Sequence, residues 1–480
     1  MNPLFATKPL DRILSEAEAV GEKTSLHRTL GPANLISLGI GAIIGAGIFT
    51  LTGQAAANHA GPAILLSFLL SALGCALAGF CYSEFSTMIP IAGSAYTYAY
   101  ATMGELIAWI IGWDLVLEYA VGAATVAIGW SATLISILHS LGIDLPPELI
   151  ASPWQPVLLP NGTQVHGLVN LPAVFIVVAI SWLLIRGIQE SATVNSIVVV
   201  IKVAVVVVFV AIGYMYVNPQ NYVPFIPANE GGDKFGWPGI LRGAGVIFFA
   251  YIGFDAVSTA AQEAKNPKKD MPIGIIGSLL ICTVLFILYA RVLTGVVNYK
   301  ELAVPSPVAL AVDRMGIPWL ALLMKLAVLA GLTSVILVML LGQSRVFFSM
   351  SRDGLLWPLF SKLHPGYRTP YLCNALLMVF VGLFAAFAPM SLVGEMTSIG
   401  TLFAFVLVSI GIIIMRKSHP DLPRSFKTPL VPLIPILSAM VNFLLMAGLG
   451  WENWLRLIVW LAIGMAIYFG YGKRHSKAHS

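Results

Sequence analysis

The segment Gly39-Ile-Gly-Ala-Ile-Ile-Gly-Ala-Gly-Ile-Phe49 decides how this sequence folds. Its first nine residues include four glycines, and the segment lies within a run of 55 residues, Thr29 to Ser83, that contains no Asp, Glu, Lys or Arg. Glycine costs about 1 kcal/mol per helix position relative to alanine. The pattern therefore predicts an apolar helix that unwinds near its middle.

The composition of the whole chain indicates a membrane protein. Of the 480 residues, 58% are hydrophobic and only 10% are charged, and the mean hydropathy is +0.87. A soluble globular chain carries about 25% charged residues, so soluble enzymes, nucleic-acid binders and disordered scaffolds are excluded. Because lipid does not tolerate open sheet edges or irregular backbone, the predicted fold class is an all-α polytopic membrane protein.

Charged or Pro/Gly-rich breaks divide the chain into twelve predicted spans, and a span needs about 20 apolar residues to cross the hydrocarbon core. Their limits are 33–57, 62–88, 104–138, 171–188, 191–217, 238–262, 272–298, 318–347, 371–389, 396–415, 429–449 and 454–472. With the N-terminus inside, the cytoplasmic segments carry 19 of the 27 Lys and Arg residues and the opposite loops carry 4. This asymmetry predicts that both termini are cytoplasmic, and it explains the net charge of +5 without a nucleic-acid partner.

The sixth predicted span has the same irregularity as the first. It contains Gly243-Ala-Gly-Val-Ile-Phe-Phe-Ala-Tyr-Ile-Gly-Phe-Asp255, in which glycines and an acid interrupt an apolar run. Glycine-interrupted segments at corresponding positions of two halves are typical of inverted-repeat secondary transporters. The unwound turns would offer backbone amides to a carboxylate and carbonyls to an ammonium group. The alternative is that the glycines only allow close helix packing.

Several of these segments carry a family resemblance. The segments 39–49 and 248–263 resemble those of the amino acid–polyamine–organocation (APC) superfamily, specifically bacterial members of the cationic amino acid transporter family. Further matching motifs are Gly112-Trp-Asp-Leu-Val-Leu-Glu-Tyr119, Asp270-Met-Pro-Ile-Gly274 and Ser351-Arg-Asp-Gly-Leu355. The resemblance covers nearly the whole chain. It implies a leucine-transporter-type fold of 12 transmembrane helices, with spans 1–5 and 6–10 forming a 5+5 inverted repeat.

The predicted organisation has four parts. Residues 1–32 form a cytoplasmic N-terminal segment, 33–415 the transport core, 416–472 spans 11 and 12, and 473–480 a cytoplasmic C-terminal tail. Asp353 is expected to form a salt bridge at the cytoplasmic end, together with the nearby Arg345 and Arg352, rather than to contact the substrate.

The resemblance also implies a substrate site at the two interrupted spans. The substrate carboxylate would meet the amides of Ala46 and Gly47, and the ammonium group would meet the carbonyls of Ile43, Phe249, Ala250 and Ile252. Many relatives have Ser or Thr where this chain has Ala46, so binding should depend more strongly on the backbone at Gly45 and Gly47. A second departure is Gln262, which stands where many relatives have Glu, beside the retained Glu263.

Lys202 lies inside an unbroken apolar run of the fifth span. A lysine at mid-helix costs about 2.5–3.5 kcal/mol on insertion scales, and burial favours its neutral form. In proton-coupled relatives a lysine on this span reaches the broken part of span 1. The resemblance therefore implies that Lys202 is a proton switch that donates to carbonyls near Gly41–Gly45. The alternative, a lysine that extends to the membrane interface, fits its depth poorly.

Three further residues are candidates near the site. Glu118 lies four residues after Asp114 on one helical face, and either contacts the substrate or forms a structural pair. Asp255 is expected to cap the second half of span 6. Met339 stands where vertebrate relatives that carry cationic substrates tend to have serine. It would fill the side-chain pocket and favour small neutral substrates, unless it only packs between helices.

The predicted function is secondary active amino acid transport in the cell (inner) membrane, by proton-coupled symport of small neutral L-amino acids such as alanine through alternating access. Two alternatives stay open: a transporter of arginine or lysine, and a proton-independent exchanger of the same fold. No metal-ligand spacing or nucleophile motif occurs, so neither an enzyme nor a cofactor is expected. The expected partners are an amino acid, protons and the lipid bilayer, and the oligomeric state is left open.

Overall fold

The computed structural model of the chain describes residues 7–9, 30–89, 94–158, 164–187, 192–259, 264–304 and 306–477. Most of the predicted N-terminal segment, together with Gln262 and Glu263, lies outside the described residues. The helices are α2 (Pro32–Ile43), α3 (Thr52–Ala55), α4 (Ile64–Met88), α5 (Ser94–Thr102), α6 (Glu105–Val116), α7 (Gly122–Ser140), α8 (Leu171–Ile185), α9 (Ala192–Gly213), α10 (Gly236–Ile247), α11 (Ala256–Thr259), α12 (Pro267–Val296), α13 (Pro307–Arg314), α14 (Pro318–Arg352), α15 (Tyr371–Phe387), α16 (Met390–Ser418), α17 (Leu433–Gly448), α18 (Trp451–Ile467) and α19 (Lys473–His475).

Seven helical stretches in the described part are long and apolar enough to cross a membrane: Gly47–Met88, Glu105–Ser140, Ser196–Tyr216, Pro267–Val296, Pro318–Arg352, Met390–Ser418 and Trp451–His475. Shorter apolar helices are α2, α8, α15 and α17. Helical structure occurs in every predicted span, which supports the polytopic helical fold class. The count of twelve crossings and the inverted repeat stay predictions.

The structure departs from the all-helical prediction in the loop 139–170. Strands β1 (Pro156–Leu158) and β2 (Gln164–His166) pair there as an antiparallel hairpin, with Val157 opposite Val165. Each strand has three residues, too few for the alternation of apolar and polar residues that identifies a strand in a sequence. The hairpin lies outside the predicted spans, so the membrane-embedded part remains helical.

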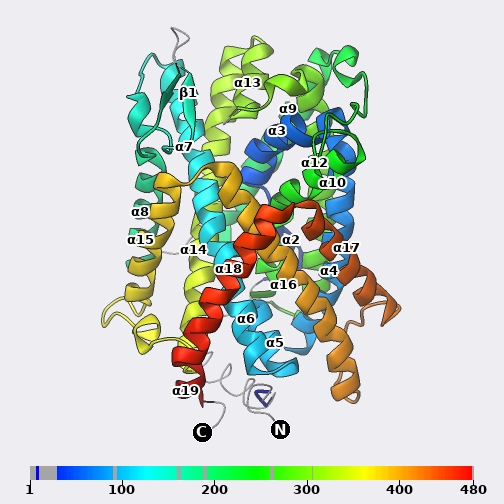
Figure 1. The fold of residues 1–480 in the computed structure, drawn as a ribbon, viewed down its shortest axis with the longest axis vertical. Coiled ribbons are helices and arrows are strands. Elements are labelled where there is room, and N and C mark those ends of the chain that lie inside the picture. Colours follow the sequence, from blue (N-terminus) through cyan, green and yellow to red (C-terminus); the bar gives the residue numbers. More distant parts are fainter. Residues whose placement is uncertain are drawn as a thin grey trace.

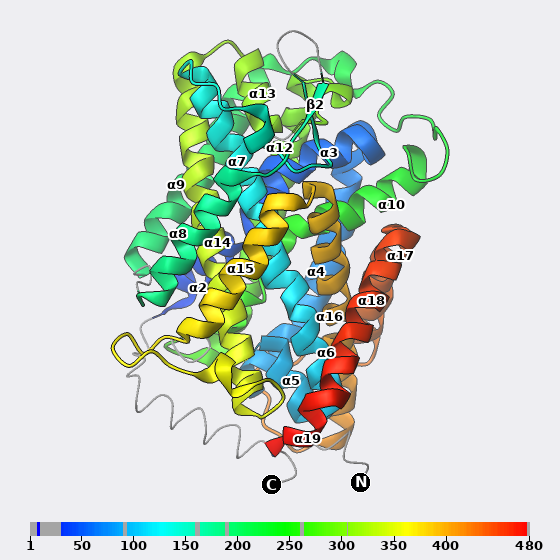
Figure 2. The ribbon, with the colours of Figure 1, turned by 60° about the vertical axis from the view of Figure 1, so that its left-hand side comes forward.

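The helices run up and down an elongated body, with α13 and β1 at one end (Figure 1). Helices α8 and α15 pack side by side at one edge of the body (Figure 1), and α17 and α18 stand at the right-hand edge in Figure 2. Helix α2 lies inside the bundle, where α9, α12 and α14 all pack against it. The broken first span is therefore surrounded by helices from both halves of the chain.

Lys8 and Lys477, which are described residues close to the two termini, lie at the same end of the molecule, because both contact Asp353. Lys8 Nζ forms an ion pair with Asp353 Oδ1 at 2.8 Å, and the Lys477 amide donates to the Asp353 carbonyl at 3.0 Å. Asp353 thus forms a salt bridge, as its position predicted.

Candidate substrate site at two broken helices

The first predicted span breaks after Ile43. Ile44 is extended, with φ −73° and ψ 101°, and a π-helical turn, Gly47–Leu51, resumes the span. Among the described residues, the amides of Gly45, Ala46 and Gly47 donate to no backbone carbonyl. The glycine-rich segment therefore unwinds, as the sequence predicted, and leaves donors available at the centre of the bundle.

The sixth predicted span also breaks. Helix α10 ends at Ile247, a 3-10 turn covers Phe248–Tyr251, and Ile252 is extended with ψ 139°. Gly253 then has φ +110°, a backbone conformation that disfavours side chains. The Ile252 amide donates to the Phe249 carbonyl at 3.3 Å, so this predicted acceptor already holds a hydrogen bond within the chain.

The two breaks lie in direct backbone contact. A Cβ atom added at Gly47 would lie 2.7 Å from both the amide nitrogen and the Cβ of Ala250, and one added at Gly253 would lie 2.9 Å from the Ala42 carbonyl oxygen. The structure thus brings the backbones of the two broken segments against each other. Ile43, Ala46, Phe249, Ala250 and Ile252 are all buried, at 4% exposure or less.

Helices α7 and α14 pack against the first break, and α16 packs against the turn Phe248–Tyr251 of the second. Val335 on α14 is 3.3 Å from a Cβ position built on Gly45, and Ala46 Cβ is 3.5 Å from one built on Gly129. Met339 lies one helical turn after Val335, and its sulfur is 3.3 Å from a Cβ position built on Gly122. The structure therefore places Met339 close to the third span, beside the turn of α14 that contacts the first break.

Lys202 contacts the first break directly. Its Nζ donates to the Gly41 carbonyl at 2.6 Å, and the side chain is only 1% exposed. Gly41 belongs to the last turn of α2, where carbonyls lose their helical partners and the helix dipole is negative. The ammonium group therefore caps the broken end of α2.

A second group of buried polar residues lies on the third span. Leu117–Val121 forms a π-helical turn, a feature that is frequent at functional sites. The Glu118 carboxylate lies beside Asp255 and Thr401, and both of its oxygens lack a hydrogen-bond partner within the described part. Tyr119 donates its hydroxyl to Asp255 Oδ2 at 2.7 Å.

Two of these features were missed in the sequence. The hydrogen bond between Asp255 and Tyr119 on the third span was not predicted, while the expected cap of the second half of span 6 by Asp255 stays a prediction. The π-helical turn was also missed, because the 112–119 motif has helical spacing throughout. Asp114 lies in the helical turn before Glu118, where its Oδ1 is 3.2 Å from a Cβ position built on Gly400.

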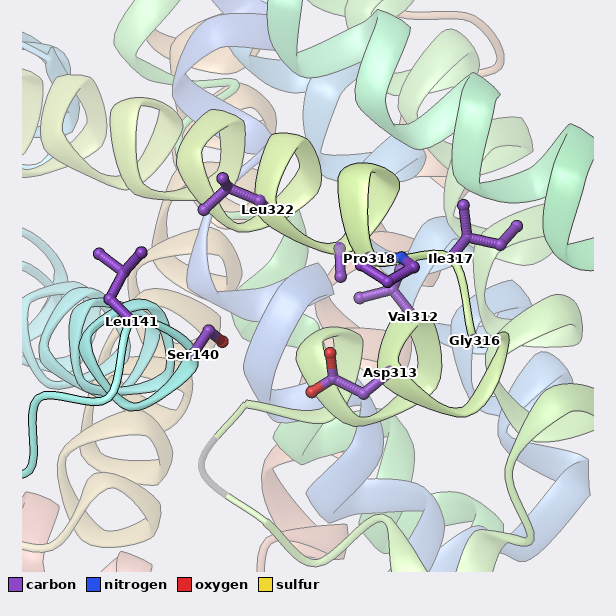
Figure 3. A pocket seen from close by; sticks show the side chains of 9 residues that line it. Ser140, Leu141, Val312, Asp313, Gly316, Ile317, Pro318 and Leu322 are labelled. Atoms are coloured by element: carbon purple, nitrogen blue, oxygen red, sulfur yellow. The ribbon is translucent and has the colours of Figure 1, made fainter.

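The described cavities lie away from the breaks. One of about 400 Å³ opens between the ends of α7, α13 and α14, and its lining includes Ser140 and Asp313 (Figure 3). Buried Lys325 donates to both, at 3.1 Å and 3.2 Å. A second cavity of about 600 Å³ beside Trp154 is mainly apolar. Neither is lined by residues of the broken segments.

Comparison with known proteins identifies the family. A sequence profile described as amino acid permease matches residues 30–471. The chain is 47% identical to the branched-chain amino acid permease BcaP of Bacillus subtilis (strain 168), over 99% of this chain and 98% of the relative. It is 42% identical to the methylthioribose transporter of the same organism, over 99% of both chains. It is also 36% identical to the vacuolar cationic amino acid transporter 4 of Arabidopsis thaliana, over 82% of this chain and 64% of the relative. These relatives are named permeases and transporters, and the chain belongs to the amino acid permease family of the APC superfamily.

Proposed function

We propose that this permease is a secondary active symporter that couples amino acid uptake to protons through Lys202. The observation that supports this most strongly is the 2.6 Å hydrogen bond from Lys202 Nζ to the Gly41 carbonyl. A charged ammonium group stabilises the C-terminal end of α2, where the helix dipole is negative. Loss of the proton removes that charge and weakens the cap. Protonation would thus bias α2 between two positions, as alternating access requires.

Lys202→Met is the first test, because methionine keeps an apolar stem of similar length but cannot carry a proton. In proteoliposomes, uptake driven by a pH gradient is expected to fall to the level seen without a gradient, while counterflow exchange continues. Lys325→Met is the matched control. Lys325 is also a buried lysine, but it lies near the N-terminal end of α14. Full gradient-driven uptake by Lys202→Met would contradict the switch role of Lys202, whereas a wild type without gradient-driven uptake would favour the proton-independent exchanger.

The substrate we propose is a small neutral L-amino acid such as alanine. The amides of Ala46 and Gly47 would hold its carboxylate, and the carbonyls of Ile43, Ala250 and Ile252, with that of Phe249, would hold its ammonium group. Met339 would fill the side-chain space opposite Gly122, and Glu118 would either contact the substrate or pair with Asp255. The names of the relatives supply the alternatives, a branched-chain or a cationic amino acid.

Competition between amino acids tests the pocket size. In the reconstituted wild type, alanine is expected to compete better than leucine, arginine or lysine. In Met339→Ala, leucine should gain about tenfold relative to alanine, since each methylene accommodated is worth about 1–3 kcal/mol. Met324→Ala, a buried methionine nearer the start of the same helix, should leave the order unchanged. Stronger competition by arginine or lysine in the wild type would contradict this role of Met339, and preference for leucine there would favour the branched-chain alternative.

We also propose the topology that the sequence predicts. Both termini would be cytoplasmic in the cell (inner) membrane, residues 33–415 would form the transport core as a 5+5 inverted repeat, and 416–472 would add two further spans. The shared location of Lys8 and Lys477 at one end of the molecule is consistent with this arrangement.

A further inference from the structure

Gly331 on α14 provides the surface on which the Lys202 side chain lies. A Cβ atom added at Gly331 would lie 3.1 Å from Lys202 Cε, 3.2 Å from Cγ and 3.6 Å from Cδ. The absent side chain therefore leaves room along most of the lysine stem, and not only at one atom. Helices α9 and α14 pack against each other, and both also pack against α2.

We propose that Gly331 is a positioning residue for proton coupling: by carrying no side chain, it lets the Lys202 stem cross α14 so that the ammonium group reaches the Gly41 carbonyl. This inference rests on the proposed function of Lys202. Nothing in the sequence pattern identified Gly331, because a single glycine in a long apolar helix is usually a packing feature. Only the position of the lysine stem gives it a role.

The surroundings of Lys202 leave the stem little freedom to move. The residue is 1% exposed, and Gly41 limits it on the α2 side. On α12, the Cys282 thiol is the titratable group whose electrostatic interaction with Lys202 is described, and the buried Tyr289 hydroxyl lies about two turns further along the same helix. At their contacts with Lys202, α2 and α14 present glycines, which do not titrate.

Contact distances of 3.1–3.2 Å force a choice on any larger residue at position 331. Either the α14 backbone or the lysine stem must move by a few tenths of an ångström, and movement of the stem shifts the ammonium group relative to the Gly41 carbonyl. Substrate binding through the broken segments does not use Gly331. A substitution there should therefore affect gradient-driven uptake more than exchange.

Gly331→Ala in the full-length reconstituted protein is the test. Gradient-driven alanine uptake, measured across a range of external pH, is expected to fall about three- to tenfold and to change its pH profile. Counterflow exchange should fall less than about twofold if the substrate site is intact. Gly382→Ala is the matched control, because a Cβ atom added there meets nothing within 4 Å. It should behave as wild type.

A double variant separates positioning from simple packing. The single variant Lys202→Met tests the proposed function on its own. When Gly331→Ala is added to it, neither gradient-driven uptake nor counterflow exchange should change further. Equal losses of uptake and exchange in both backgrounds, or wild-type behaviour of Gly331→Ala, would overturn the inference. If Gly331→Ala does not fold, the Lys202→Ala/Gly331→Ala protein is tested. Recovery of folded protein supports the contact, and failure in both backgrounds overturns it.

Discussion

A single methyl group at Gly47 is expected to abolish transport. In Gly47→Ala the new Cβ would lie 2.7 Å from the Ala250 amide nitrogen. Backbone atoms cannot rotate away from such a contact, so the two broken segments must separate. Overpacking of this kind costs about 1–3 kcal/mol or more. If this close contact between the two breaks is required once in each transport cycle, the population that forms it and the uptake rate should fall by about 100-fold.

The measurement is initial-rate alanine uptake and counterflow in proteoliposomes, normalised to the amount of folded protein. Both activities should be lost together, which distinguishes this variant from Lys202→Met. Gly382→Ala again serves as the control for adding a methyl group to a glycine where there is open space. Uptake by Gly47→Ala within a factor of about three of wild type would mean that the contact between the breaks is not part of the cycle.

The positions of both breaks could be predicted from the sequence because glycine affects the local backbone. Four glycines in nine residues weaken a helix wherever it packs, and the structure ends α2 inside that segment. Lys202 was identified for a similar reason, since a lone lysine in an apolar run is costly in any fold. These signals depend on local chemistry alone.

Contacts between distant segments could not be predicted in this way. Tyr119 meets Asp255 across 136 positions of the chain, and the contact between Gly331 and Lys202 depends on how α9 crosses α14. The π-helical turn Leu117–Val121 has no distinct residue pattern, because its wider ring reflects tertiary packing. The sequence therefore predicted which residues to consider for the site, whereas the contacts that these residues make with distant segments could be identified only from the structure.

One face of α14 links three of the features described above. Gly331, Val335 and Met339 are spaced four residues apart, so they lie on the same side of the helix. Gly331 lies against Lys202, Val335 lies against Gly45 of the first break, and Met339 lies against Gly122 of the third span. Lys202, the first break and the third span are therefore all adjacent to α14. A displacement of α14 relative to the rest of the bundle would alter all three contacts together.

The largest loss of stability is expected from Glu84→Ala. Glu84 is fully buried on α4 and accepts from Arg416 Nε and Nη2 at 2.9 Å and from the Thr428 amide at 2.8 Å. Arg424 Nε lies 3.3 Å from the same carboxylate, and its side chain is 6% exposed. The carboxylate thus joins the second span to the end of the tenth and to the loop before the eleventh.

Removing Glu84 leaves a buried guanidinium group without its charged partner, which costs about 3–5 kcal/mol. The melting temperature in detergent, followed by size-exclusion chromatography after heating, should fall clearly for Glu84→Ala and less for Glu84→Gln, which keeps the shape and two polar atoms.

Glu452→Ala is the control. It removes an exposed partner of Arg456 and should change stability by less than about 1 kcal/mol. Because the Glu84 cluster lies apart from the broken segments, transport by the surviving folded fraction should be normal. A wild-type melting temperature for Glu84→Ala would show that the two arginines find other partners or water, and that the cluster does not hold these three segments together.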